Sequence, residues 1–181
     1  MPTQKVSEHG IPEPNIPATA VTDQDLQFLR RAIELAREAR SDGRHPFGCV
    51  IVNERGEIVV ESRNNAVRPG GEPTQHAELV ACSAAGRLLT ESELARCTLY
   101  TSTEPCAMCA GAIYWCGIGR VVFALSEKGL LAFTGNDEQN PTLDLPCREV
   151  FARGQRPIAV AGPLLEEEAR VVHEGFWQPT N

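Results

Sequence analysis

The sequence has no apolar run that approaches the roughly 20 residues of a membrane-spanning helix. Its N-terminus also lacks the apolar core of a secretory signal peptide. Of its 181 residues, 42% are hydrophobic and 23% are charged. This composition is typical of a water-soluble globular protein. We therefore expect a cytoplasmic protein with no membrane partner.

Positive charge is also scarce, since 17 Lys and Arg residues stand against 24 Asp and Glu residues for a net charge of −7. Nucleic-acid-binding proteins usually carry a basic patch that displaces counterions from phosphates. Arginines and glutamates alternate on one predicted helix: Arg30, Arg31, Glu34, Arg37, Glu38 and Arg40. Such interleaving is typical of a solvated helix face with ion pairs. A nucleic-acid partner is therefore not expected.

The seven cysteines are an odd number and are scattered through the periodic segments. In a reducing compartment such a set indicates free thiols or metal ligands rather than a disulfide framework.

Hydrophobic periodicity divides the chain into alternating helices and strands. Residues 1–20 hold four prolines and no periodic pattern, so we expect a flexible tail followed by one domain over residues 21–181. The predicted helices cover residues 22–41, 76–86, 105–115, 126–133 and 163–176. The predicted strands cover residues 47–52, 57–61, 98–102, 120–125 and 158–161, with a hairpin between the first two and a long loop over 135–146. This alternation predicts an α/β fold in which helices cover a mixed sheet.

Two short stretches concentrate the residues that bind metals and move protons. They are His76-Ala77-Glu78 and Pro105-Cys106-Ala107-Met108-Cys109. Two cysteines at this spacing can reach one ion from a single helical turn, and the histidine adds a third ligand. Three protein ligands leave the fourth tetrahedral position of Zn²⁺ open, which is typical of a catalytic site. Glu78 is then a carboxylate that is not needed as a ligand.

Each stretch taken alone has a simpler interpretation. A Cys-x-x-Cys pair can be a redox centre or half of a structural zinc site. The second Cys/His pair of a structural site is missing, since Cys116 and Cys147 do not form one. His76 alone could be a helix cap, and Glu78 alone could face solvent. Their combination favours a catalytic metal site.

The region from residue 46 to residue 125 resembles zinc deaminases of the cytidine deaminase-like superfamily, and within it the guanine deaminase and nucleoside deaminase branch. The segments that carry the resemblance are Pro46-Phe47-Gly48, Pro73-Thr74-Gln75-His76-Ala77-Glu78, Glu104-Pro105-Cys106-Ala107-Met108-Cys109 and Gly111-Ala112-Ile113-Tyr114-Trp115. The resemblance implies a three-layer α/β/α fold around a mixed five-stranded sheet, and a homodimer. It also implies a zinc-dependent aminohydrolase that releases ammonia from a free nucleobase, a nucleoside or a related aminated heterocycle, with guanine as the best candidate.

The resemblance assigns the chemistry to the two stretches. His76, Cys106 and Cys109 would hold one zinc ion, which lowers the pKa of its bound water from about 16 to about 7 so that hydroxide can attack the ring carbon. Glu78 would take the proton, deliver it to a ring nitrogen and then protonate the departing amine. Positioned proton transfer of this kind contributes about 10²–10⁴-fold.

The resemblance also implies substrate-binding residues. Asn64 matches an asparagine that hydrogen-bonds the base, and its side-chain amide can both donate and accept. Phe47 and Trp115 match aromatic residues that line the base pocket. A turn position is the alternative for Asn64, and a place in the hydrophobic core is the alternative for the two aromatic residues.

Two segments depart from the guanine deaminase pattern, so the sequence does not determine which ring is deaminated. An acidic Gly-Phe-Asp-Asp-like segment is replaced by Leu131-Ala132-Phe133-Thr134-Gly135-Asn136-Asp137-Glu138, where Asp137, Glu138 or the later Asp144 and Glu149 could substitute. The final segment, His173-Glu174-Gly175-Phe176-Trp177, matches no pattern of the family. A tRNA adenosine deaminase and a non-catalytic, zinc-stabilised binding protein are the alternative functions.

Overall fold

The computed structural model describes residues 20–67, 69–135, 137 and 140–177. The predicted tail lies outside these ranges except for residue 20. In the described part of the chain, no helix has both the length and the apolar character needed to cross a membrane.

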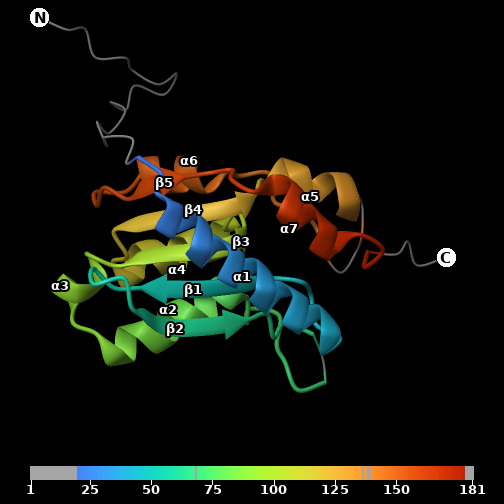
Figure 1. Ribbon diagram of the computed structural model, residues 1–181, viewed down its shortest axis with the longest axis horizontal. Coiled ribbons are helices and arrows are strands. Elements are labelled where there is room, and N and C mark those ends of the chain that lie inside the picture. Colours follow the sequence, from blue (N-terminus) through green and yellow to red (C-terminus); the bar gives the residue numbers. More distant parts are fainter. Residues whose placement is uncertain (1–19, 68, 136, 138–139, 178–181) are drawn as a thin grey trace, which may run out of the picture.

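The centre of the fold is a five-stranded sheet in the order β2-β1-β3-β4-β5 (Figure 1). The strands are β1 (Gly48–Val52), β2 (Ile58–Arg63), β3 (Thr98–Thr103), β4 (Arg120–Leu125) and β5 (Ala159–Ala161). β1 pairs antiparallel with both β2 and β3, whereas β4 runs parallel to β3 and β5. The predicted hairpin and the mixed sheet of five strands are therefore confirmed.

Helices cover both faces of the sheet, which confirms the three-layer architecture (Figure 1). On one face lie α1 (Asp23–Ser41) and α7 (Glu166–His173), with α5 (Glu127–Thr134) packed against α7. On the other face lie α2 (Ala77–Leu88), α4 (Ala107–Cys116) and α6 (Cys147–Ala152). The short helix α3 (Glu91–Leu94) follows α2.

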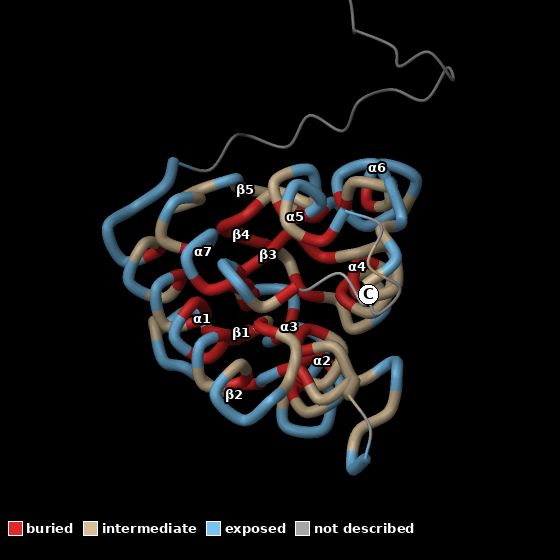
Figure 2. Tube along the Cα trace, turned by 90° about the vertical axis from the view of Figure 1, so that its right-hand side faces the viewer, coloured by how far each residue is buried: buried red, intermediate tan, exposed pale blue. Residues whose placement is uncertain are grey.

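Alternate residues of β1 enter two separate cores. Cys49 and Ile51 pack on the side of α2 and α4, while Val50 and Val52 pack on the side of α1. All five residues of β1 are buried, which explains why its sequence is not an alternation of apolar and polar residues. Figure 2 shows the inner strands buried between helices whose outer surfaces are exposed.

The structure differs from the sequence prediction mainly in short helices. α3 and α6, of 4 and 6 residues, were not predicted because such lengths give no recognisable helical period. The last helix is shorter than predicted, since α7 begins only at Glu166, after Leu165 in the left-handed region with a φ of 55°.

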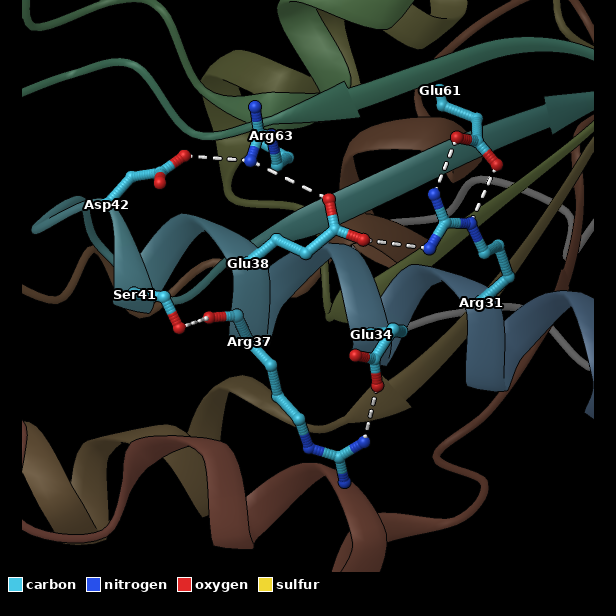
Figure 3. A network of polar contacts seen from close by, with 8 residues as sticks. All are labelled: Arg31, Glu34, Arg37, Glu38, Ser41, Asp42, Glu61 and Arg63. Carbon is cyan, nitrogen blue, oxygen red and sulfur yellow. Dashed lines mark hydrogen bonds and ion pairs between the residues drawn. The ribbon is translucent and has the colours of Figure 1, made fainter.

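Ion pairs are present on the first helix as predicted, but within α1 they join residues three and seven positions apart instead of the four expected, and the other pairs connect α1 or its C-cap residue to residues outside the helix (Figure 3). The pairs are Arg30–Glu168, Arg31–Glu38, Arg31–Glu61, Arg37–Glu34, Arg63–Glu38 and Arg63–Asp42, with N–O distances from 2.7 to 3.6 Å. Arg40 instead donates to the backbone oxygen of Val172 at 2.8 Å. Because these guanidinium groups are already held, this face does not form a free basic surface for phosphates.

Candidate active site

The three predicted metal ligands meet where two helices begin. His76 is the N-cap residue of α2, Cys106 is the N-cap residue of α4, and Cys109 follows in the first turn of α4. One ligand atom from each residue lies within 4.8 Å of the other two. Nδ1 of His76 is 3.7 Å from Sγ of Cys106. The structure therefore brings the predicted ligands to one point.

The contacts among these residues distribute the protons unevenly. The pKa of the Cys106 thiol is lowered to about 4, chiefly by the hydrogen bond from Cys109. Burial acts in the opposite direction, and the contact with His76 lowers the pKa further. The contact with Cys106, together with burial, raises the pKa of Cys109. Cys106 is thus the anionic sulfur, and binding of a dication would displace the proton that Cys109 keeps.

Glu78 lies beside this cluster in the first turn of α2 and is only 5% exposed. Its Oε1 accepts a hydrogen bond from the Thr101 hydroxyl at 2.5 Å, and its Oε2 accepts one from the Cys109 thiol at 3.5 Å. Burial raises the pKa of Glu78, although the Thr101 hydrogen bond acts in the opposite direction. A buried carboxyl of raised pKa next to a ligand cluster is suited to accept and release a proton.

The donor set fits a zinc ion. One imidazole nitrogen and two sulfurs are the ligand types that zinc prefers, and three protein ligands leave one position for water or substrate. Across the residues that the structure describes, this is the one group of three His, Cys, Asp or Glu side chains close enough to hold a metal ion.

A cavity of ≈ 40 Å³ lies over the ligand cluster and adjoins a larger space of ≈ 500 Å³. The two share Phe47, His76 and Asn140. The residues that line the smaller cavity are Phe47, Asn64, His76, Glu78, Thr103, Glu104, Cys106, Glu127, Leu130 and Asn140. Two of the three candidate ligands, His76 and Cys106, therefore border one space with Glu78 and two of the three predicted substrate-binding residues.

Asn64 presents an unpaired donor in this cavity. The residue is 3% exposed, and its Oδ1 accepts the backbone N–H of Ala66 at 2.9 Å. Its Nδ2 is buried and has no hydrogen-bond partner. A buried amide without a partner costs free energy unless another molecule supplies an acceptor. The orientation that Ala66 imposes thus leaves a hydrogen-bond donor for a ligand.

Phe47 lines both cavities and is supported by the segment that matched no family pattern. Its ring centroid lies 5.4 Å from that of His173 and 6.1 Å from that of Trp177. Nε1 of Trp177 donates a hydrogen bond of 3.1 Å to Nδ1 of His173. The C-terminal segment therefore forms the backing of an aromatic wall of the cavity.

Trp115 lies elsewhere. Its side chain is 80% exposed near the end of α4, where it contacts Tyr114 edge-to-face with ring centroids 5.5 Å apart, and it lines neither cavity. The buried face of α4 is formed by Cys109, Ala110 and Ile113 instead. Within one chain the structure thus separates Trp115 from the base pocket predicted for it, and it is not a core residue.

Three of the acidic residues proposed from the 137–149 region, Asp137, Asp144 and Glu149, do not line the small cavity, and the fourth, Glu138, lies outside the described residues. Among the described residues of this region, Asn140 borders the cavity. The pKa of Glu127 is raised first by burial, and the charge of Asp144 adds a smaller contribution in the same direction.

Sequence reasoning missed several residues of the cavity wall, among them Thr103, Glu127 and Leu130. Thr103 is the last residue of β3, and Glu127 comes two residues after β4. These strands are neighbours and parallel, with Thr103 opposite Leu125. Because ligands of α/β proteins bind at the carboxyl ends of parallel strands, a known strand order would have pointed to both residues.

Comparison with known proteins places these observations in a family. Residues 22–125 match the family described as the cytidine and deoxycytidylate deaminase zinc-binding region. A probable cytosine deaminase from Schizosaccharomyces pombe is 43% identical over 160 residues, which are 88% of this chain and 96% of its own. A guanine deaminase from Bacillus subtilis is 42% identical over 125 residues, which are 67% of this chain and 78% of its own. The tRNA-specific adenosine deaminases are relatives as well.

A solved structure of a guanine deaminase from Nitrosomonas europaea superimposes with a TM-score of 0.68. The superposition covers 90% of this chain and 88% of the other, at 27% sequence identity.

Proposed function

This chain belongs to the cytidine and deoxycytidylate deaminase zinc-binding family and is a hydrolytic deaminase, and we propose that its substrate is a free nucleobase or a closely related aminated heterocycle. The observation that carries the proposal is the cluster of three candidate metal ligands beside a small cavity, which a buried carboxyl and an unpaired amide donor also line. Such a set can hold a metal ion, a proton and a polar ring edge together.

In this proposal, His76, Cys106 and Cys109 hold the zinc ion. When bound, zinc supplies an activated water at neutral pH. Glu78 takes the proton of that water and passes it to a ring nitrogen, then protonates the departing amine. Burial beside the cluster supports this role, because it raises the pKa of Glu78 toward the range in which a carboxyl both accepts and donates.

Asn64 and Phe47 position the ring in this proposal. Nδ2 of Asn64 donates to a carbonyl oxygen or ring nitrogen of the substrate, since Oδ1 is already occupied by Ala66. Phe47 offers its face or edge to the flat ring. A single donor and an aromatic wall suit both pyrimidine and purine bases.

Guanine and cytosine are the two leading substrates. Guanine is favoured by the motifs around His76 and Cys106 and by the match to the Bacillus subtilis enzyme. Cytosine is favoured by the match to the Schizosaccharomyces pombe protein, which covers 96% of that protein's length, against 78% for the guanine deaminase.

The test is a panel assay on zinc-loaded protein. Purified enzyme is incubated with aminated purines, pyrimidines, pterins and triazines, and the release of ammonia is followed. The Glu78→Gln variant, checked for retained zinc, is the matched control and is expected to be slower by about 10²–10⁴-fold. Failure of every compound to release ammonia would overturn the proposal.

A tRNA adenosine deaminase is the second candidate. The net charge of −7 and the ion-paired arginines of α1 count against it. A binding titration with tRNA at physiological salt separates the two functions, because a tRNA enzyme binds tightly and loses affinity steeply as salt rises.

We also propose that the chain forms a homodimer, as the resemblance to the family implies. An exposed Trp115 on α4 supports this, because a second copy could cover its ring. Sedimentation of the wild type and of Trp115→Glu tests it. A monomeric wild type would exclude a dimer, and an equally dimeric variant would place the interface elsewhere.

A further inference from the structure

We propose that Glu127 and Thr103 form the acceptor site for the exocyclic amino group that the reaction removes. The inference rests on the proposed deaminase function and assigns a role to two residues that the zinc motifs do not include. Both line the small cavity together with Glu78 and Cys106.

Thr103 contributes a hydroxyl that forms no hydrogen bond within the described part of the chain. The residue is 3% exposed, and its Oγ1 is buried without a hydrogen-bond partner. A lone hydroxyl in a buried position carries a desolvation cost that a ligand group can remove. Since this hydroxyl belongs to a residue of the cavity wall, the missing partner is expected to be the substrate.

Glu127 contributes a carboxyl surrounded by other anions. Burial first, and then the charges of Cys106, Glu104, Glu78 and Asp144, raise the pKa of Glu127 to about 7, so a hydrogen-bond donor in the cavity would stabilise its ionised form. A carboxylate in such surroundings is satisfied by a neutral hydrogen-bond donor or a cation that enters the cavity. The amino group at the reacting carbon is a donor that every proposed substrate brings close to the metal ligands.

The position of Glu127 is not explained by helix capping. Ser126 is the N-cap residue of α5, and its Oγ accepts the N–H of Gly129 at 3.1 Å. Glu166 in turn accepts hydrogen bonds from the backbone N–H and hydroxyl of Ser126. The start of α5 is therefore stabilised without the Glu127 side chain.

The neighbouring carboxylate, Glu104, serves the fold rather than the ligand. Its Oε2 accepts the backbone N–H of Glu127 at 3.2 Å, and its Oε1 accepts that of Cys147 at 3.2 Å. Glu104 thus fixes the backbone at Glu127 and leaves that carboxyl as the acceptor facing the cavity.

This arrangement discriminates the substrate from its own product. Deamination replaces the C–NH₂ group by a carbonyl, with oxygen from water and ammonia as the second product. The amino group donates to Glu127 and Thr103. The product carbonyl presents only lone pairs to the carboxylate, although it can still accept a hydrogen bond from the Thr103 hydroxyl. The Glu127 carboxylate therefore makes the site bind the aminated base more tightly than the oxo product, which favours release after turnover.

The test is a binding measurement in which no turnover occurs. In the Glu78→Gln background, calorimetry gives the dissociation constants of cytosine and uracil, and of guanine and xanthine. The expected amino-over-oxo preference falls by about tenfold when Glu127→Gln is added, the effect of losing one hydrogen bond to a charged acceptor. Thr103→Val is expected to weaken the binding of aminated and oxo compounds alike by a few-fold, because the hydroxyl can accept from the first and donate to the second.

The control is Glu149→Gln in the same background, since Glu149 is exposed on α6 and outside the cavity. Zinc content and thermal unfolding confirm that each protein is folded and loaded. An unchanged amino-over-oxo ratio in Glu127→Gln would overturn the assignment while leaving the proposed function intact. If neither aminated base binds and the panel assay also fails, the proposed function falls, and the inference with it.

Discussion

The hydroxyl of Thr101 donates a hydrogen bond of 2.5 Å to Oε1 of Glu78, so the central strand of the sheet holds the carboxyl that we propose as the proton carrier. Thr101 is fully buried on β3, and Glu78 is 5% exposed on α2. The bond therefore links the rigid centre of the fold to the site.

Replacing Thr101 by Val removes this bond at nearly constant volume. Since the bond lowers the pKa of Glu78, the pKa should rise in the variant. Glu78 must be ionised to accept a proton, so the acidic limb of the kcat/KM profile is expected to move to higher pH, with about tenfold lower kcat/KM at pH 7. Thr101→Ser keeps the hydroxyl and should behave like the wild type. An unshifted profile in Thr101→Val would contradict the role of this bond.

Asn64→Asp keeps an oxygen for the N–H of Ala66 but replaces the donor in the cavity by an acceptor. Steady-state kinetics should show kcat/KM lower by about 10²-fold, because a donor is lost and a repulsive contact is created. Zinc content should stay close to that of the wild type, whereas the unfolding temperature should fall, because the new carboxyl is buried without a partner. Wild-type kinetics in this variant would remove Asn64 from the substrate site.

The zinc content of cysteine variants tests the ligand set. Cys109→Ser should lose most of its metal, whereas the wild type and Cys116→Ser should each hold about one zinc per chain, because three strong ligands are needed to retain the ion. Elemental analysis after dialysis against a weak chelator gives the result. Equal zinc in Cys109→Ser and Cys116→Ser would show that the metal lies elsewhere.

The buried imidazole of His173 makes stability depend on pH. Burial first, and then Arg40, lowers the pKa of His173 from 6.5 to about 4. Between these values the unfolded chain binds more protons than the folded one, so this contribution to stability is present above pH 6.5 and is lost as pH falls toward 4. From pH 7 to pH 4.5 the loss amounts to about 2 kcal/mol.

His173→Asn, which keeps an acceptor for Nε1 of Trp177, isolates this effect. Urea unfolding at both pH values should show that the variant loses about 2 kcal/mol less than the wild type over this range. Parallel losses in the two proteins would mean that His173 does not titrate as described.

Much of the fold was predictable because its signals are local. The first helix was placed correctly from Thr22 and Asp25, which form a reciprocal capping box at its start. The ligand cluster was also predictable, since His76 and Cys106 occur in motifs that place each at a helix N-terminus. The strand predicted over residues 47–52 was also correct, and its continuous apolar run agrees with β1 being buried on both faces.

The remainder of the site depends on long-range geometry. Trp115 follows Tyr114 in a matching motif, yet the rotation of α4 directs Ile113 into the core and leaves Trp115 exposed. Glu127 and Thr103 become neighbours only because β3 and β4 pair in parallel. No local pattern in the sequence contains that pairing.

The most direct test of hydrolytic deamination is the origin of the oxygen in the product. Zinc-loaded enzyme is allowed to turn over its best base from the panel in ¹⁸O-labelled water, and the product is analysed by mass spectrometry together with the ammonia released. We predict one ¹⁸O in each new product molecule, an equal amount of ammonia, and a loss of about 10²–10⁴-fold in rate in zinc-retaining Glu78→Gln. Product without solvent oxygen, or undiminished turnover in that variant, would contradict the account.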